Sequence, residues 1–140
     1  MPELNLVEKV MALEAVELLG NLSPQQLARV ASIAREVTYP PDKMILEQAQ
    51  PADALYVIVD GAVEISGNAG ALVTAHRHEV LGAWALFVED PLPVKARTLE
   101  DTKLLRIARD EFYDLLSDNP EITAAIFTTL VKRFQKLVQA

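Results

Sequence analysis

The chain has 140 residues and 15.4 kDa, of which 51% are apolar and 24% charged, a composition typical of one globular domain that excludes a disordered or collagen-like chain. No apolar run reaches the about 18 to 20 residues of a membrane span, and the N-terminus lacks the basic start and apolar core of a signal peptide, so we expect a cytoplasmic protein without direct membrane insertion. The lack of cysteine excludes disulfides and thiolate metal sites, and the formal net charge of -7 opposes binding to nucleic acid phosphates.

Residues 1–34 are expected to form N-terminal helices. Between residues 4 and 19, apolar side chains recur with a helical period and charged side chains lie between them, which predicts one or two short amphipathic helices. Ser23 and Gln26 then have the spacing of a capping box, with a proline at the first helical position. A second helix is therefore predicted from about Pro24 to Ala34.

From residue 35 to residue 107 the apolar period changes to two, which is typical of strands. Strands are predicted at residues 37–39, 44–46, 55–59, 62–66, 72–74, 94–99 and 103–107. Asp60-Gly61 predicts a tight hairpin, because a two-residue turn requires the positive φ that glycine adopts. A second pairing is predicted around Glu100-Asp101. The short, closely spaced strands indicate a barrel or jelly roll.

Residues 109–138 are expected to form a C-terminal helix pair. The first helix is predicted at 109–117, and Asn119 is placed as the N-cap of a second helix of about five turns. Apolar side chains form a stripe along that helix at Ile122, Ile126, Leu130, Phe134 and Leu137. Helices, a β block and helices in this order predict a single domain over 1–140 of the α+β class, mainly β.

Four segments of the sequence resemble the cyclic nucleotide-binding domain family, which includes the sensory domain of catabolite activator protein and protein kinase A regulatory subunits. The segments are 24–30, 39–45, 51–61 and 99–107. The resemblance extends in order over nearly the whole chain. It implies an eight-stranded β jelly roll flanked by N-terminal helices and a C-terminal helix pair.

In that family a phosphate-binding cassette holds the nucleotide. Backbone amides at a helix start and an arginine bind the cyclic phosphate, and a glutamate accepts the ribose 2′-hydroxyl. The aligned run here is 81–94, in which Ala83 stands at the glutamate position and Leu92 at the arginine position. Counting from Gly82 and from the strand at 103–107 gives the same alignment. The expected pocket of this degenerate cassette comprises Gly82, Ala83, Trp84, Ala85, Leu86, Pro91, Leu92 and Pro93.

The two substitutions remove the charged partners of a cyclic nucleotide. Losing one hydrogen-bonded charge partner costs about 2 to 5 kcal/mol, so we expect no cAMP or cGMP binding in the family manner. Asp42, Ala49 and His78 also stand where the family usually has glycine. We therefore expect the geometry of these turns to have drifted.

Other residues that could carry chemistry have simpler interpretations. His76 and His78 would face one side of a strand and suggest a metal or haem site, but without a third histidine or a cysteine we interpret them as solvated loop residues and expect no metal and no cofactor. Trp84 could stack on a base, although a core position is the preferred interpretation. The neighbouring carboxylates Glu89-Asp90 and Glu100-Asp101 point apart, so no enzyme activity is expected.

These observations predict a non-enzymatic regulatory or interaction module within a larger protein. Its partner would be a protein, a neighbouring domain or a second copy of the chain that contacts the interaction helix through Ile122, Ile126, Leu130 and Phe134. Because the sequence ends at Ala140, it has no room for a helix-turn-helix domain, and we expect no DNA binding. The alternative is a sensor that binds a more apolar ligand, or a nucleotide in a different mode, in the same cavity. A third hypothesis is haem or metal sensing through His76 or His78.

Overall fold

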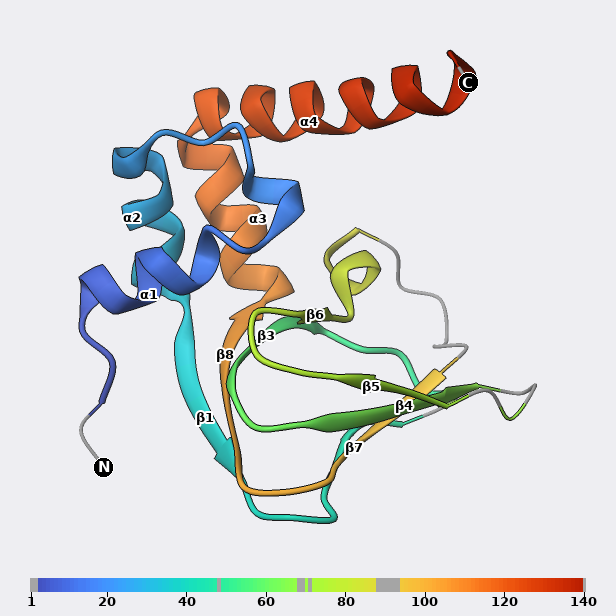
Figure 1. Cartoon of the computed structure of the whole chain (residues 1–140). Helices are drawn as coiled ribbons and strands as arrows, with labels where there is room; N and C mark the ends of the chain where they lie inside the picture. The colour runs from blue at the N-terminus through green and yellow to red at the C-terminus, as the bar shows by residue number, and fades with distance from the viewer. Residues whose placement is uncertain (1–2, 48, 68–69, 71, 88–93, 140) are drawn as a thin grey trace.

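Two antiparallel sheets form the β part of the computed structural model, which describes residues 3–47, 49–67, 70, 72–87 and 94–139 (Figure 1). Within these residues the strands are β1 (Arg35–Tyr39), β2 (Met44–Leu46), β3 (Ala54–Asp60), β4 (Val63–Gly67), β5 (Leu72–Ala75), β6 (Val80–Leu81), β7 (Val94–Thr98) and β8 (Thr102–Ala108). One sheet has the order β1-β8-β3-β6 and the other has the order β2-β7-β4-β5. The expected eight-stranded jelly roll is confirmed.

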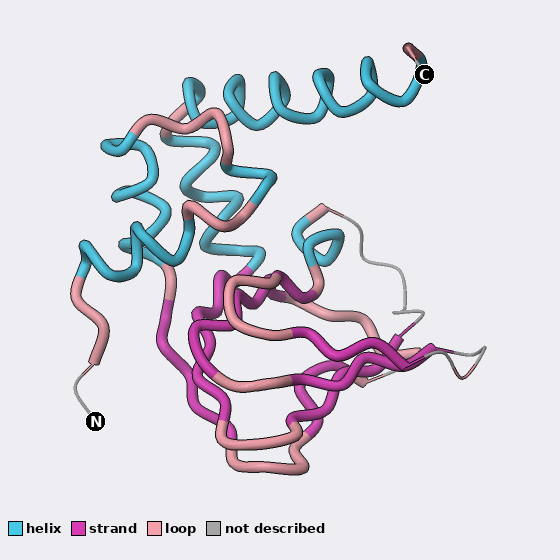
Figure 2. Tube along the Cα trace, viewed as in Figure 1, coloured by secondary structure: helices cyan, strands magenta, loops and turns pink. Residues whose placement is uncertain are grey.

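The helices gather at one end of the β-roll (Figure 2). They are α1 (Leu6–Leu13), the 3-10 turn η1 (Glu17–Leu19), α2 (Pro24–Ile33), the 3-10 turn η2 (Ala83–Leu86), α3 (Arg109–Asp118) and α4 (Pro120–Val138). The predicted capping box of α2 is present, because the Gln26 N–H donates to the Ser23 hydroxyl and the Ser23 N–H donates to the Gln26 side chain. Among the described residues, no helix has both the length and the apolar character that crossing a membrane requires.

Strand β3 divides the interior into two apolar clusters. Side chains that include Tyr56 and Ile58 pack between the two sheets, whereas Leu55 and Val57 pack against the helices. Alternate side chains of a strand point to opposite faces, so a strand that is covered on both faces is apolar throughout. This position explains the continuous apolar sequence of β3.

Two predicted hairpins are wrong. Strands β3 and β4, which flank Asp60-Gly61, lie in different sheets, and so do β7 and β8. Both turns carry the chain from one sheet to the other instead of pairing the strands beside them. Gly61 has φ +117°, and a β-carbon there would lie 2.5 Å from the Thr102 hydroxyl oxygen, so the turn requires glycine for close packing between the sheets.

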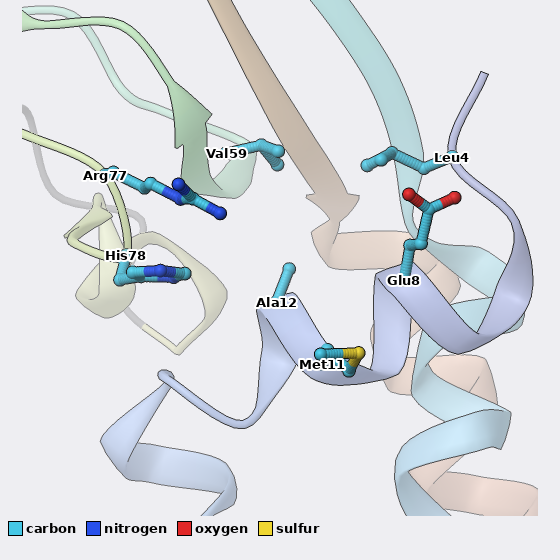
Figure 3. Close-up of a pocket in the computed structure, with 7 residues that line it drawn as sticks. All are labelled: Leu4, Glu8, Met11, Ala12, Val59, Arg77 and His78. Atoms are coloured by element: carbon cyan, nitrogen blue, oxygen red, sulfur yellow. The ribbon is translucent and has the colours of Figure 1, made fainter. Parts of the chain in front are cut away.

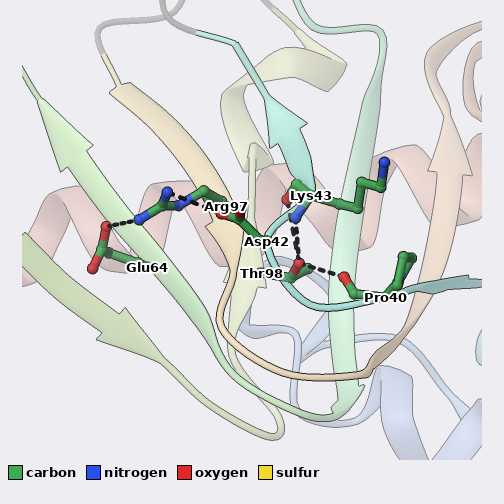
Figure 4. A network of polar contacts seen from close by, with 6 residues as sticks. All are labelled: Pro40, Asp42, Lys43, Glu64, Arg97 and Thr98. Atoms are coloured by element: carbon green, nitrogen blue, oxygen red, sulfur yellow. Dashed lines mark hydrogen bonds and ion pairs between the residues drawn. The ribbon is translucent and has the colours of Figure 1, made fainter.

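The expected drift of the glycine turns is also wrong. Asp42, Ala49 and His78 have φ values of 61°, 65° and 74°, so these non-glycine residues keep the left-handed conformation that glycine adopts easily. Contacts from β7 hold the turn at Asp42 (Figure 4). The backbone N–H of Asp42 donates to the Thr98 carbonyl at 2.9 Å, and Arg97 forms a 2.9 Å ion pair with the Asp42 carboxylate.

The Thr98 hydroxyl completes this network. It donates to the Pro40 carbonyl at 2.7 Å and accepts the Lys43 N–H at 2.8 Å, while Arg97 also contacts Glu64 at 3.3 Å (Figure 4). Because Thr98 is buried, its hydroxyl needs these partners. Long-range contacts therefore fix the turn between β1 and β2 despite its unfavourable local conformation.

Asn119 stands at the N-cap of α4 as predicted, but its side chain does not cap the helix. Its amide instead joins neighbouring helices: the Nδ2 atom donates to the Leu115 carbonyl at 2.8 Å and the Oδ1 atom accepts from Arg29 at 2.7 Å. The reason is its position at the tight junction of α3 and α4, where Asn119 is buried. A buried amide needs partners for both of its ends.

Candidate functional site

The start of the expected cassette follows β6. Gly82 is buried and has φ +71°, which brings the chain into the short turn η2. Leu86 is buried against the helical core, and Ala83 is half-buried. Ala83, which the sequence alignment assigns to the family's glutamate position, is thus the first residue of η2.

The remainder of the expected pocket lies outside the described residues. This is the case for Pro91, Leu92 and Pro93, for Glu89-Asp90, and for the side chains of Trp84 and Ala85. The assignments of Leu92 to the arginine position and of Trp84 to the core stay predictions.

A cavity of about 510 Å³ lies where η1, η2 and α4 meet. Ala83 from η2 and Leu130 from α4, which the sequence analysis assigned to separate sites, line the same space. Most of the other lining side chains are apolar, namely Ala15, Val16, Leu18, Val80 and Phe87. The polar lining side chains are Glu17, His78, Glu79 and Arg133. The cassette and the interaction helix are therefore neighbours across an open apolar cavity.

The apolar stripe of α4 has two different environments. Ile122 and Ile126 are 0% and 4% exposed and belong to the helical core, whereas Leu130 and Phe134 are 42% and 64% exposed. Figure 1 shows that the C-terminal part of α4 extends away from the other helices. The predicted stripe is thus a docked inner half followed by an exposed outer half.

Two polar contacts attach α4 to the segment around η1. The Asn21 amide donates to the Thr129 hydroxyl at 2.6 Å, and Arg133 forms a 3.4 Å ion pair with Glu17. The exposed apolar side chains of the helix are Phe127, Leu130, Val131, Phe134, Leu137 and Val138. Such a cluster on a polar surface is typical of an interaction site.

The two histidines do not lie on a strand, which agrees with their interpretation as solvated loop residues and not with the alternative of a pair on one side of a strand. Both occupy the turn between β5 and β6, and both are exposed. Among the described residues, no group of three or more histidine or acidic side chains could hold a metal ion. The geometry therefore adds no third ligand to the pair.

The sequence analysis missed a partly exposed polar cluster around Arg106. Arg106 is the cross-strand partner of Tyr56, and it forms a 3.1 Å ion pair with Asp53. Burial, followed by the neighbouring Tyr56 hydroxyl, raises the pKa of Tyr39. The position of Arg106 could have been predicted from the sequence, because alternate side chains of a strand point to the same face and Arg106 follows Leu104 by two residues on β8. Both Asp53 and Tyr56 engage the Arg106 guanidinium.

Comparison with known families supports this fold. The model of the family described as the cyclic nucleotide-binding domain matches residues 36–119. The matched segment begins in β1 and ends at the junction of α3 and α4. It includes the β-roll, the cassette and the first helix of the C-terminal pair.

Individual relatives agree with this match. The chain is 30% identical over 112 residues to the cAMP-dependent protein kinase regulatory subunit of Aspergillus fumigatus. The aligned segment covers 79% of this chain and 27% of that subunit. It is 22% identical over 120 residues to the CRP-like cAMP-activated global transcriptional regulator of Mycobacterium tuberculosis, covering 82% of this chain and 54% of the regulator. The N-terminal domain of a transcriptional regulator from Streptomyces coelicolor has the same fold, with a TM-score of 0.83 and 24% identity over 92% of this chain and 96% of that domain.

Proposed function

Because this chain belongs to the cyclic nucleotide-binding domain family, we propose that it is a regulatory module that acts through a protein partner and does not bind cAMP or cGMP in the family manner. The observation that carries this proposal is Ala83, whose half-buried methyl group occupies the cassette's glutamate position. A methyl group cannot accept a hydrogen bond from a ribose hydroxyl.

Charge supports the same proposal. Leucine at position 92 supplies no cation to a cyclic phosphate, and Arg106 is already engaged by Asp53. A bound phosphate would be desolvated without its charged partner, at a cost of about 2 to 5 kcal/mol. This cost corresponds to a loss of affinity of about thirty-fold to several thousand-fold.

The exposed outer half of α4 is the proposed contact with a partner, either a neighbouring domain or a second copy of the chain. The chain spans about a quarter of the length of the fungal relative and about half of the length of the mycobacterial one, which is consistent with a module of a larger protein. We further propose that the chain has no enzyme activity of its own and acts in the cytoplasm. The regulatory names of two relatives favour the first of these two assignments.

A sensor of an apolar molecule is the second candidate function. It is favoured by the cavity of about 510 Å³, because most of its lining side chains are apolar and it touches both η2 and α4. Cavities of this size hold small organic ligands. A ligand there would touch both Ala83 on η2 and Leu130 on α4 and would thereby affect the position of the outer half of α4.

Calorimetric titration with cAMP and cGMP tests the first proposal. We expect no saturable binding up to millimolar nucleotide. A micromolar dissociation constant for either nucleotide would contradict the proposal.

A restored cassette provides the matched experiment. Ala83→Glu combined with Leu92→Arg returns the two missing partners, so we expect measurable cAMP affinity in the double variant. Ala83→Glu alone is the control and should remain silent, because it lacks the cation that binds the phosphate. A folded double variant without affinity would show that the two side chains are insufficient to explain the loss.

A further inference from the structure

A second cavity, of about 320 Å³, lies between α1 and the turn that joins β5 to β6 (Figure 3). Its apolar lining comprises Leu4, Met11, Ala12 and Val59. Arg77 and His78 line one side, and Glu8 lies on the opposite side (Figure 3). The cavity is thus apolar in the middle and charged at its two ends.

The backbone fixes the cationic side of this cavity. The Glu79 N–H donates to the His76 carbonyl at 3.1 Å and closes the turn that carries Arg77 and His78. Two further hydrogen bonds tie the turn to β3: the His78 N–H donates to the Ile58 carbonyl at 2.8 Å, and the Ile58 N–H donates to the Glu79 carbonyl at 2.9 Å. Arg77 and His78 therefore project from a preorganised support.

The two charged ends are not equally available. The Glu8 carboxylate accepts the Asn5 N–H at 3.0 Å as part of the α1 capping box, and Figure 3 shows it turned toward Leu4. Arg77 forms no ion pair or hydrogen bond with any residue in the described part of the chain. Arg77 is therefore the charged side chain of the cavity whose hydrogen-bond donors remain available to a ligand.

The backbone conformation of His78 is a second observation that points to a role for its side chain in this cavity. The residue has φ 74°, where glycine would be unstrained, yet its side chain lines both this cavity and the larger one beside α4. A glycine at this position would form the turn more easily but would remove that wall. The imidazole thus forms part of the wall of both cavities.

We propose that this cavity binds a small amphipathic carboxylate. Arg77 and His78 hold the carboxylate group, and the apolar body of the ligand packs on Met11, Ala12 and Val59. The volume lies in the range of small-molecule sites, about 300 to 1,000 Å³. Because the whole chain carries a formal net charge of -7, its overall field does not attract anions, and recognition depends on these two side chains. The site is separate from the cassette and goes beyond the regulatory role proposed above.

Three probes of equal chain length test the ligand class: octanoate, octanol and octylamine, each titrated by calorimetry into the whole chain. We expect saturable binding of octanoate, at least tenfold weaker binding of octanol, and the weakest binding of octylamine. Equal affinity for octanoate and octanol would overturn the role of the cationic end. No binding of octanoate would overturn the proposal as a whole.

Two variants identify the residues. Arg77→Gln should weaken octanoate binding at least tenfold and leave octanol binding unchanged. His78→Gly should also weaken octanoate binding while the thermal midpoint stays equal or rises, since glycine relieves the backbone conformation. His76→Ala is the matched control, because His76 belongs to the same turn and is not among the lining side chains. An unchanged octanoate affinity in Arg77→Gln would contradict the assignment.

Discussion

The guanidinium of Arg29 in α2 donates a 2.7 Å hydrogen bond to the side-chain oxygen of Asn119, at the junction of α3 and α4. Asn119 is only 5% exposed, and its amide nitrogen donates to the Leu115 carbonyl. The direction in which α4 leaves the domain is thus held by a buried amide that contacts two helices.

Removing that amide should destabilise the domain. Asn119→Ala leaves the Arg29 guanidinium and the Leu115 carbonyl without these partners, so we expect the free energy of unfolding to fall by about 1 to 3 kcal/mol in urea titrations. Ser32→Ala is the control: its exposed hydroxyl bonds only within α2, to the Arg29 carbonyl, and should cost less than about 0.5 kcal/mol. A cost for Asn119→Ala no larger than that of the control would show that the junction does not depend on this side chain.

The two halves of α4 should respond differently to truncation. Ile122→Ala removes a fully buried side chain and should lower the free energy of unfolding by about 2 to 5 kcal/mol. Phe134→Ala removes a side chain that is 64% exposed and should change it by less than about 0.5 kcal/mol. Similar losses in thermal or urea unfolding would mean that the outer half is also docked.

Self-association through the outer half has its own test. Leu130→Asp with Phe134→Asp places charge on the exposed apolar surface. If a second copy covers this surface, light scattering should show a dimer for the natural sequence and a folded monomer for the double variant. A variant that remains dimeric would exclude the outer half of α4 as the contact.

Glu36 should make stability depend on acid pH. Its carboxylate accepts the Leu4 N–H at 3.0 Å and pairs with Lys103 at 3.0 Å. The Leu4 hydrogen bond, followed by the contact with Lys103, lowers the pKa of Glu36 below its usual 4.5 although burial acts in the opposite direction. A lowered pKa in the folded state means that the stabilisation is complete above the unfolded pKa and is lost as pH falls through the folded pKa.

The corresponding measurement compares Glu36→Gln with the natural sequence. The variant should be less stable at pH 7, and the difference should shrink below about pH 4, as read from urea unfolding across the acid range. Glu111→Gln is the control, because its ion pair with Arg35 is exposed to solvent and should add little at any pH. A Glu36→Gln deficit that persists unchanged at low pH would contradict the assigned cause.

Glycine substitutions should distinguish the strained turn from a helix. Ala49 has φ 65°, so Ala49→Gly should relieve about 1 kcal/mol of backbone strain in the folded state. This gain offsets the loss of stability that comes from the greater conformational freedom of glycine in the unfolded chain. We expect the thermal midpoint to stay equal or rise. The same change at Ala28, inside α2, should cost about 1 kcal/mol. Equal destabilisation at both positions would argue against strain at Ala49.

Local patterns predicted the helices more accurately than the pairing of strands. Ser23 and Gln26 cap α2 through groups only three residues apart, so the sequence contains both partners of the interaction. Asp60-Gly61 is also a local signal, but whether the flanking strands pair or enter different sheets depends on Thr102, far along the chain, which packs against Gly61. Strand β6 has two residues and is too short to show any period.

The candidate site could be predicted only in part for the same reason. The cassette alignment predicted a short helix at this point of the chain, and η2 begins at Ala83, whereas the role of Ala83 stays a prediction. It could not show that Ala83 and Leu130 share a cavity, or that Arg77 and His78 face α1, because these relations depend on how separate elements pack. The sequence pattern likewise placed one stripe on α4 without showing that only Ile122 and Ile126 are buried.

Strands β1 and β8 pair directly although Arg35 and Arg106 are about seventy residues apart in the chain. Folding must therefore close a long loop, and lose the corresponding chain entropy, before this pairing can form. Domains dominated by such non-local pairings fold in about milliseconds to seconds. Because β8 also pairs with β3, the last strand of the β-roll completes the sheet that the first strand begins. During synthesis, β1 and β3 must wait for β8 to emerge from the ribosome before the sheet between them can form.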